Sequence, residues 1–299
     1  MARKTYWENR MEQLYNAQDK LNNSFDKRLK KEYMRIEQQI KKEIASYYQR
    51  YGKDNVIEYR NLVQSLSPEE RELLYQNYEE FARRNPQYMH LMPIRESIYQ
   101  LNRLEGLQLS IRMLMVELGA FEEEGFRKLL EEAYRTGYLA TFKGLANAPT
   151  FFNINGTFLQ QTINNNWVNG ENFSDRIWAN KEKLINMLNN EIRDAVIRGE
   201  DYRTMATIIS NRLDVGHNEA LRLIATESAF VLNQANKQAF IDAGIEEYQI
   251  TAVLDSRTSP MCQELNGERF KFEDAKVGIN YPPFHPWCRT TVIPIENEE

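Results

Sequence analysis

The N-terminal part of the chain carries an uninterrupted apolar stripe at helical spacing. Apolar or aromatic side chains recur from Trp7 to Tyr51 in 12 steps over 44 residues, or 3.67 residues per step, and only Gln18 departs from the pattern. This period is that of a helix and exceeds the value of about 3.5 for a left-handed coiled coil. Because no proline or glycine intervenes before Gly52, we predict one helix over residues 5–51, roughly 70 Å long. Such a helix must pack its stripe along other helices or a partner chain.

The same stretch is basic, whereas the rest of the chain is acidic. Residues 1–53 hold 13 Lys+Arg and 7 Asp+Glu, a net +6, and the remainder holds 25 and 36, a net −11, which together give −5. A basic arm on an acidic body indicates contact with an anion, such as double-stranded DNA or an acidic protein. The competing interpretation is a solvated helix with i,i+4 ion pairs. The candidate contact residues are Lys27, Arg28, Lys30, Lys31, Arg35, Lys41 and Lys42.

Capping signals predict that the body is also helical. In SLSPEERELL, Ser67 is a suitable N-cap, Pro68 suits the first helical position, and Glu70 completes a capping box for a helix that runs to about residue 84. Further helices are expected over about 93–117, 119–142, 176–198 (capped by Ser174 or Asp175 and closed by Gly199), 201–213 and 218–243. The glutamates at 122–124 fit a helix N-terminus and its dipole better than a metal cluster.

Two segments depart from this helical pattern. Residues 144–173 contain eight asparagines, three glycines and one proline, which is typical of a loop or a domain boundary. Near the C-terminus, EYQITAVLD, the Asn266-Gly267 turn signal before ERFKF, and TTVIPI predict strands. We therefore expect residues 245–299 to form a small, mostly antiparallel β module docked on the preceding helices.

The expected fold is mainly α, with a long N-terminal helix, a helical body and a small antiparallel β-containing (α+β) C-terminal module. The sequence divides into a basic helical arm (1–53), a helical region (54–145), an Asn/Gly-rich linker or loop (146–174) and a C-terminal module (175–299).

Several classes of protein are disfavoured by what the sequence lacks. The first residues have no apolar signal-peptide core, and no run approaches the roughly 18 apolar residues of a membrane span. Two cysteines do not make a disulfide framework, so we expect synthesis in a reducing cytoplasm. Neither a P-loop nor a dinucleotide-binding fingerprint occurs.

Reactive side chains gather in the C-terminal module, where PPFHPWCRTT spans residues 282–291. His285 and Cys288 have the spacing of a zinc half-site, and Cys262 lies 23 residues before His285. Asp255 is a candidate fourth ligand, although nothing in the spacing requires it. With three ligands and a water the site would be of the open, catalytic kind.

Other interpretations of the same residues remain open. Pro282, Pro283 and Pro286 make the loop rigid, so His285 could simply donate to a backbone carbonyl while Trp287 and Cys288 fill a small core. In that case Arg257 and Arg289 would pair with Asp255 or Glu227. A Cys262–Cys288 disulfide would form only in an oxidising compartment. A triad of a cysteine, His285 and an acid is also conceivable, but no nucleophile-elbow motif surrounds either cysteine.

The C-terminal motifs, taken in order, resemble a known family. ATE at 225–227, DSRTSPMC at 255–262, NGERF at 266–270, VGINYPPFHPWCR at 277–289 and VIP at 292–294 look like the Mu F-like minor head proteins of tailed bacteriophages. The resemblance covers about residues 175–295, and TYWENRMEQL and FSDRIW extend it loosely toward members from phages of Gram-positive hosts. The matching positions are Glu227, Asp255, Arg257, Thr258, Cys262, Gly267, Pro283, His285, Pro286, Cys288 and Arg289.

The resemblance implies a virion protein inside the phage head, made in the host cytoplasm, that associates with the portal and acts in head assembly and in DNA retention or ejection. The implied partners are the portal protein, capsid or scaffolding protein, and double-stranded DNA bound nonspecifically. Some members carry further cysteines where this chain has Ser259 and Thr290, which weakens a zinc assignment carried over from them. Mu F-like modules also occur fused to toxins, and we expect none after residue 299.

Three functions are therefore compared. The first is a non-enzymatic minor head protein with no catalytic residues. The alternative is a metal-dependent nuclease or other hydrolase, in which zinc is held by Cys262, His285, Cys288 and Asp255, with Glu227 as the base. The third is a cellular helical adaptor, which applies only if the resemblance is accidental.

Overall fold

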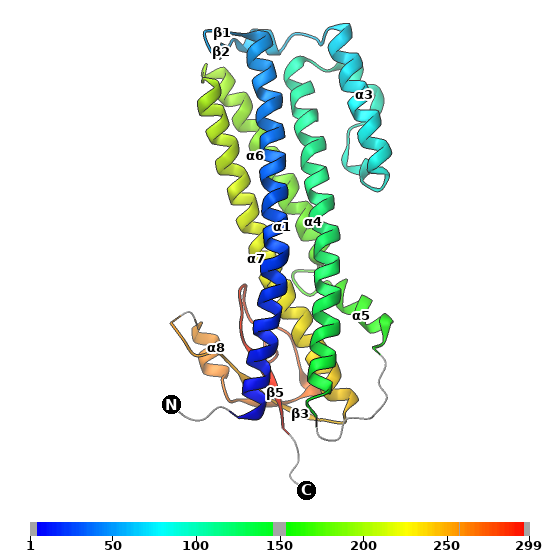
Figure 1. The fold of residues 1–299 in the computed structure, drawn as a ribbon, viewed down its shortest axis with the longest axis vertical. Helices are drawn as coiled ribbons and strands as arrows, with labels where there is room; N and C mark the ends of the chain where they lie inside the picture. The colour runs from blue at the N-terminus through cyan, green and yellow to red at the C-terminus, as the bar shows by residue number, and fades with distance from the viewer. Residues whose placement is uncertain (1–4, 146–153, 257, 296–299) are drawn as a thin grey trace. The chain divides into compact units, whose positions relative to one another are not determined.

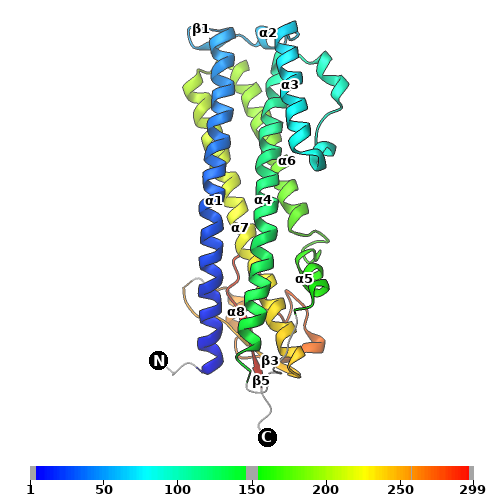
Figure 2. The same ribbon diagram turned by 45° about the vertical axis from the view of Figure 1, so that its right-hand side comes forward.

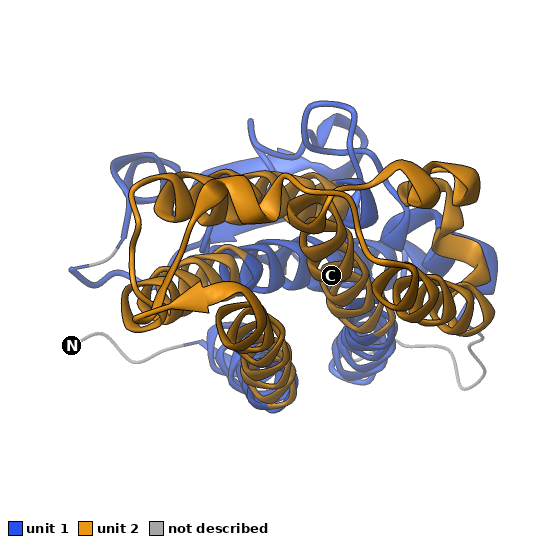
Figure 3. Ribbon diagram, turned by 90° about the horizontal axis from the view of Figure 1, so that it is seen from above, with its two compact units in different colours: residues 1–27, 125–175, 220–299 blue, residues 28–124, 176–219 orange. Residues whose placement is uncertain are grey.

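The computed structural model describes residues 5–145, 154–256 and 258–295. The chain divides into two compact units (Figure 3). Unit 1 contains residues 1–27, 125–175 and 220–299, and unit 2 contains residues 28–124 and 176–219. Each unit is thus assembled from segments that are far apart in the sequence.

Helices dominate both units (Figure 1). The α-helices are α1 (Tyr6–Tyr51), α2 (Tyr59–Leu62), α3 (Pro68–Arg84), α4 (Arg103–Phe142), α5 (Gly156–Ile163), α6 (Phe173–Ile197), α7 (Tyr202–Asp242) and α8 (Pro260–Leu265). The 3-10 helices are η1 (Pro86–Leu91), η2 (Arg95–Gln100) and η3 (Phe272–Asp274), and the strands are β1 (Gly52–Lys53), β2 (Val56–Ile57), β3 (Glu247–Thr251), β4 (Arg269–Lys271) and β5 (Thr291–Ile295). The predicted mainly α fold with a long N-terminal helix is confirmed.

Helix α1 is continuous over 46 residues, as its apolar period predicts. In unit 1 its stripe supplies Trp7, Met11 and Leu14 to the core. In unit 2 the stripe continues through buried aromatic and aliphatic side chains, among them Tyr33, Ile36, Ile40 and Ile44. Gln18, the exception in the stripe, is also buried and donates to Asn22 Oδ1 at 2.9 Å. The expectation that this helix packs along other helices of the chain is confirmed.

Unit 1 places the first part of α1 beside the second part of α4 (Figures 1 and 2). Arg10 Nε donates to the carbonyl of Ala140 at 3.0 Å, and the rings of Phe25 and Phe126 meet edge to face at 5.7 Å. Gly125 permits this approach, because a Cβ there would lie 2.2 Å from Phe25 Cε2. Close aromatic packing therefore fixes the separation of the two helices in this unit.

The C-terminal β module also belongs to unit 1 and agrees with the sequence prediction. Its three antiparallel strands lie in the order β4-β3-β5, with Tyr248 opposite both Phe270 and Pro294. Gly267 has φ +92° and forms the turn before β4, where its N–H donates to Ile250 O at 2.9 Å. Tyr248, Phe272 and other buried residues of the module share one hydrophobic cluster with Trp7 of α1 and Phe240 of α7.

Unit 2 begins with the remainder of α1, the two-stranded β1-β2 hairpin and α3. The predicted capping box is present, since Ser67 Oγ accepts from Glu70 N and the Glu70 carboxylate accepts from Ser67 N. Helix α3 ends at Arg84, before the Asn85-Pro86 pair. A second hydrophobic cluster, including Leu74, Phe81, Leu109 and Met113, packs α3 against the first half of α4.

The prediction of separate helices over 93–117 and from 119 onward is wrong, because α4 is one helix of 40 residues. It starts later than expected, at Arg103, where Asn102 and Glu105 form a reciprocal cap with N···O distances of 2.8 and 2.9 Å. Gly119 lies inside the helix because it packs closely: a Cβ there would be 2.6 Å from Trp178 Cζ3. The glutamates at 122–124 consequently lie in mid-helix, and their assignment to a helix N-terminus is also wrong.

The boundaries predicted for the later helices are corrected in the same way. The helices expected over 201–213 and 218–243 are one helix, α7, of 41 residues. Gly216 lies within it, and a Cβ there would meet Leu184 Cδ2 at 2.6 Å. Helix α6 is capped by Asn172, whose Oδ1 accepts from Ser174 N and Asp175 N, so the cap lies before both Ser174 and Asp175, the residues expected to form it.

The predicted linker over residues 146–174 contains a short helix, α5, capped by the side chain of Asn155. Residues 146–153 lie outside the described residues. The division of the sequence at residues 53, 145 and 174 stays a prediction. Within the described part of the chain, no helix is both long and apolar enough to cross a membrane.

A buried ion pair lies inside unit 2. Lys181 of α6 and Glu122 of α4 are 2% and 0% exposed, and Lys181 Nζ lies 2.6 Å from Glu122 Oε2. Lys181 Nζ also donates to Tyr33 Oη at 2.7 Å, and that hydroxyl donates to Glu122 Oε2 at 3.2 Å. Burial and the neighbouring Glu122 carboxylate raise the pKa of Tyr33, so its phenol stays protonated as a donor.

Candidate functional site

The first element of the candidate site is α8, which carries Cys262. Ser259 is its N-cap, and its Oγ accepts from the Cys262 N–H at 3.2 Å. Pro260 follows at the first helical position, so the sequence itself encodes the start of this helix. Cys262 is 2% exposed and faces the interior of the β module.

The second element is a tight turn from His285 to Cys288. The Cys288 N–H donates to the His285 carbonyl at 3.2 Å. Pro286 is at the second position of the turn and Trp287, with φ +62°, is at the third, which is the arrangement of a type II turn. The turn brings the side chains of residues 285 and 288 to the same side as Cys262.

Cys262, His285 and Cys288 form a compact group in which all the ligand-type atoms lie within 4.8 Å of one another. Cys262 Sγ is 3.2 Å from His285 Nε2 and 3.8 Å from Cys288 Sγ. Both cysteines are free and buried. Burial raises the pKa of the Cys288 thiol, and the neighbouring Cys262 raises it further. Two sulfurs and one imidazole nitrogen at this spacing could hold a metal ion.

The orientation of His285 follows from its other ring nitrogen. Nδ1 lies 2.7 Å from the carbonyl oxygen of Pro286. A carbonyl only accepts, so Nδ1 carries the proton and Nε2 presents its lone pair to Cys262. This agrees with the predicted contact to a backbone carbonyl. It also means that the histidine partner is not a carboxylate, as a catalytic triad would require.

Asp255 lies outside the Cys–His group. Both of its carboxylate oxygens accept from Arg289 Nη2 at 2.7 Å, and its backbone N–H donates to Thr258 Oγ1 at 2.8 Å. The pairing of Arg289 with Asp255 is the one expected for a structural loop. Arg257 lies outside the described residues.

Glu227, Gly267 and Pro283, which also belong to the predicted motif, lie outside the Cys–His group. Glu227 of α7 is 2% exposed, and its Oε2 accepts from Trp167 Nε1 at 3.0 Å, so it is not part of the Cys–His group. Gly267 forms the turn before β4, and the Pro282-Pro283 peptide bond is cis.

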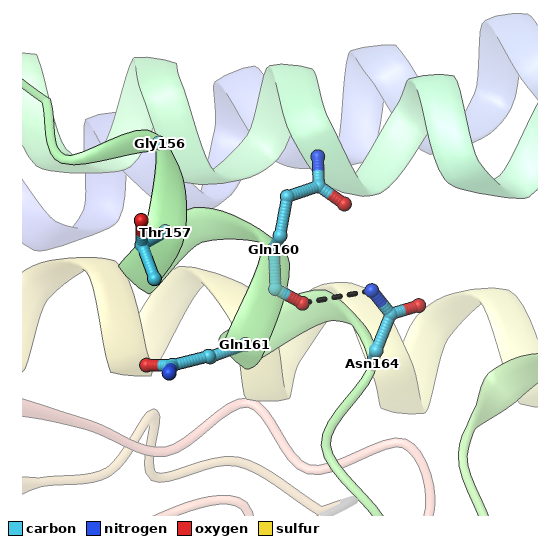
Figure 4. A pocket seen from close by; sticks show the side chains of 5 residues that line it. All are labelled: Gly156, Thr157, Gln160, Gln161 and Asn164. Atoms are coloured by element: carbon cyan, nitrogen blue, oxygen red, sulfur yellow. Dashed lines mark hydrogen bonds between the residues drawn. The ribbon is translucent and has the colours of Figure 1, made fainter.

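Unit 1 contains two hollows that differ in volume and in the side chains that line them. A cavity of about 20 Å³ is bordered by Cys262 and His285, together with residues of the same loops, among them Ser259 and Trp287. A much wider surface hollow of about 630 Å³ follows α5 (Figure 4). Its lining is Gly156, Thr157, Gln160, Gln161 and Asn164. None of these side chains titrates, so the lining offers no side chain that could act as a general acid or base.

The candidate contact cations of α1 differ in accessibility. Arg35 pairs with Glu32 at 2.5 Å and Lys41 pairs with Glu37 at 2.5 Å. Arg35 and Lys42 also border a groove of about 520 Å³ in unit 2 that contains four glutamates. Lys27, Arg28, Lys30 and Lys31 are all exposed.

Sequence reasoning missed a buried polar network beside the site. Asn233 of α7 is fully buried; its Nδ2 donates to Tyr15 Oη at 3.0 Å and its Oδ1 accepts from Thr291 Oγ1 at 2.9 Å. Its carbonyl accepts from Tyr281 Oη at 2.7 Å, and Tyr15 Oη donates to Thr290 O at 2.9 Å. Burial raises the pKa of both tyrosines, so the phenols remain donors. One asparagine thus joins α7 to α1, to β5 and to Tyr281, which directly precedes the Pro-rich loop (residues 282–290).

The left-handed backbone at Trp287 supports a prediction. A non-glycine residue in this conformation carries a penalty of about 1–2 kcal/mol, and the Trp287 ring is 54% exposed, so little burial compensates. We expect Trp287→Gly to be more stable than Trp287→Ala by about 1 kcal/mol, net of the backbone entropy of glycine. Urea unfolding of the two variants measures this difference. Both lack the indole, so a more stable alanine variant would show that the turn does not strain this residue.

Comparison with known proteins identifies the region that contains this site. Residues 186–293 match the family described as Phage Mu protein F like protein. The match includes the end of α6, all of α7 and the β module up to β5, and therefore Cys262, His285 and Cys288. Neither the curated proteins nor the solved structures that were compared contain a match to the chain. The resemblance inferred from the motifs is confirmed over this region.

Proposed function

We propose that this chain, whose residues 186–293 belong to the Mu F-like family, is a minor head protein located inside the virion of a tailed bacteriophage. In this role it associates with the portal, contacts capsid or scaffolding protein during head assembly, and takes part in retaining or releasing the DNA. It acts as a structural component rather than as an enzyme. The family match is the observation that carries the proposal.

The geometry of the Cys–His group supports a non-enzymatic role. A hydrolase would need a base and space for a substrate at the metal. Glu227, the candidate base, is engaged by Trp167, and Asp255 is engaged by Arg289. The adjoining cavity has a volume of about 20 Å³, which matches one water molecule.

Two measurements test the assignment to the phage head. Mass spectrometry of purified virions from the phage that encodes the chain should detect it, and treatment that removes tails should leave it with the heads. Affinity purification after co-expression with the portal protein of that phage should recover both proteins. Its absence from virions would contradict the proposal.

We propose that the exposed cations of α1 contact the DNA backbone. Lys30 and Lys31 are exposed and form no ion pair among the described residues, whereas Arg35 and Lys41 are paired with glutamates. Contacts from such side chains go to phosphates, which makes binding independent of sequence and sensitive to salt. Removal of residues 1–53 would be a poor test, because α1 contributes to the core of unit 1.

The prediction is that Lys30→Glu/Lys31→Glu weakens binding to double-stranded DNA. If both lysines meet phosphates, the slope of log K against log salt should become shallower by about 1.8, from about 0.9 per contact. Fluorescence anisotropy with a labelled duplex at several salt concentrations measures the slope.

A charge-matched control separates a local contact from a net-charge effect. Arg83→Glu/Arg135→Glu makes the same change in charge at exposed positions of α3 and α4. This control should keep the wild-type slope. Equal slopes for the two double variants would contradict a specific role for α1.

A further inference from the structure

We propose that Cys262, His285 and Cys288 bind one zinc ion, which joins α8 to the Pro-rich loop and has a single water as its fourth ligand. Two thiolates and an imidazole are a donor set that zinc favours over calcium, magnesium or manganese. The ligands come from two short segments that precede and follow β4 in the sequence, so the ion would cross-link parts of the β module that, among the described residues, no strand pairing connects.

The distances agree with tetrahedral coordination. With zinc–sulfur bonds of about 2.3 Å, tetrahedral angles place two sulfurs about 3.8 Å apart. The two Sγ atoms lie 3.8 Å apart. A sulfur and an imidazole nitrogen would be about 3.6 Å apart, and Cys262 Sγ and His285 Nε2 lie at 3.2 Å. Both distances from Cys262 Sγ therefore lie within about 0.4 Å of the tetrahedral values, and all three ligand atoms lie within 4.8 Å of one another.

The surroundings prepare His285 to be a ligand. Its Nδ1–H donates to the Pro286 carbonyl, which leaves the Nε2 lone pair directed at the sulfurs. Metal-bound histidines generally have such a partner on the second nitrogen, which sets the tautomer and the ring orientation. Pro286 lies in the turn that also carries Cys288, so one rigid element supplies two ligands and the supporting acceptor.

The cavity beside the group supplies the fourth position. It is bordered by Cys262 and His285, and its volume of about 20 Å³ exceeds the roughly 10–15 Å³ that one water requires. This volume matches one water molecule. This explains how a site with three protein ligands can be structural, although most structural zinc sites have four.

Elemental analysis of the full-length protein, purified without chelator, tests the proposal. We expect about one zinc per chain in the wild-type protein. His285→Ala should lose the metal, whereas His285→Cys should keep it, because cysteine restores a ligand at the same position. In a competition titration of metal-free protein with Zn²⁺, His285→Ala should bind at least about 100-fold more weakly than wild type.

A control variant and a spectroscopic measurement distinguish loss of the zinc site from a general folding defect. His90→Ala removes an exposed histidine of η1 and should keep the zinc of the wild-type protein. Co²⁺ bound to wild-type protein should show the absorption of a tetrahedral thiolate complex. Wild-type protein that is folded but free of metal after purification with added Zn²⁺ would overturn the proposal. Zinc retained by both His285→Ala and Cys262→Ser, or an intact mass lower by two hydrogens from a Cys262–Cys288 disulfide, would also overturn it.

Discussion

Replacing Lys181 by methionine is expected to destabilise the protein by roughly 3–5 kcal/mol, because the change leaves the buried Glu122 carboxylate without its cation. Lys181 is 2% exposed and lies 2.6 Å from Glu122 Oε2. Glu122 Oε1 already has no hydrogen-bond partner among the described residues, so the site has no spare donor to replace the ammonium. Urea unfolding measures the loss.

The double variant Lys181→Met/Glu122→Leu should recover most of that stability, since an apolar pair of similar volume requires no compensation of charge. A matched control is available on the same helix. Lys183 pairs with Glu219 at 2.9 Å but is 59% exposed, and Lys183→Met should cost less than about 1 kcal/mol. A Lys181→Met variant as stable as Lys183→Met would contradict the importance of the buried pair.

Truncation of Asn233 is expected to have the second largest effect. Asn233→Ala removes the acceptor of the buried Thr291 hydroxyl and the donor to Tyr15 Oη. An unsatisfied buried polar group costs about 1–3 kcal/mol, and a small cavity adds to it. We therefore expect a loss of roughly 2–4 kcal/mol in the unfolding free energy, measured by urea denaturation.

Two comparisons make this expectation specific. Gln234→Ala changes the next residue of α7, which is only half-buried, and should shift stability by less than about 0.5 kcal/mol. Thr291→Val removes the hydroxyl instead. In a double-mutant cycle Asn233 and Thr291 should couple by about 0.5–3 kcal/mol. Additive effects, or an Asn233→Ala variant as stable as Gln234→Ala, would show that the network does not hold the module.

Local signals account for what could be predicted of the fold. The apolar period of α1, the Ser67 capping box and the Asn266-Gly267 turn each depend on neighbouring residues, and each agrees with the structure. Helix boundaries at glycines were mispredicted because the effect of Gly119 and Gly216 depends on distant side chains. Intrinsic propensity disfavours glycine in a helix by about 1 kcal/mol, but close packing against another helix outweighs it here.

Only part of the candidate site could be predicted from the sequence. The His285-x2-Cys288 spacing indicated that these residues act together, and Cys262 was the remaining cysteine. Their convergence could not be deduced, because it depends on the tight turn at Trp287 and on where α8 docks. Asp255 was grouped with them by residue type, whereas its carboxylate binds Arg289.

No sequence pattern indicated that Asn233 and Lys181 would form buried polar contacts. Each polar residue lies in an ordinary helical stretch, and its partners come from segments far away in the chain: Tyr15 and Thr291 for the asparagine, Glu122 for the lysine. A long-range pairing of this kind becomes visible only when the helices are placed side by side.

The buried pair in unit 2 also determines the axial register of its helices. Apolar side chains of similar size let two helices slide past each other by one turn, about 5.4 Å, with most contacts replaced by equivalent ones. Such a slip of α6 along α4 would separate Lys181 Nζ from Glu122 Oε2, now at 2.6 Å, and would leave two charges alone in an apolar interior. Every shifted alignment is therefore penalised, and a single charged contact selects one alignment of these helices from many that apolar packing would accept.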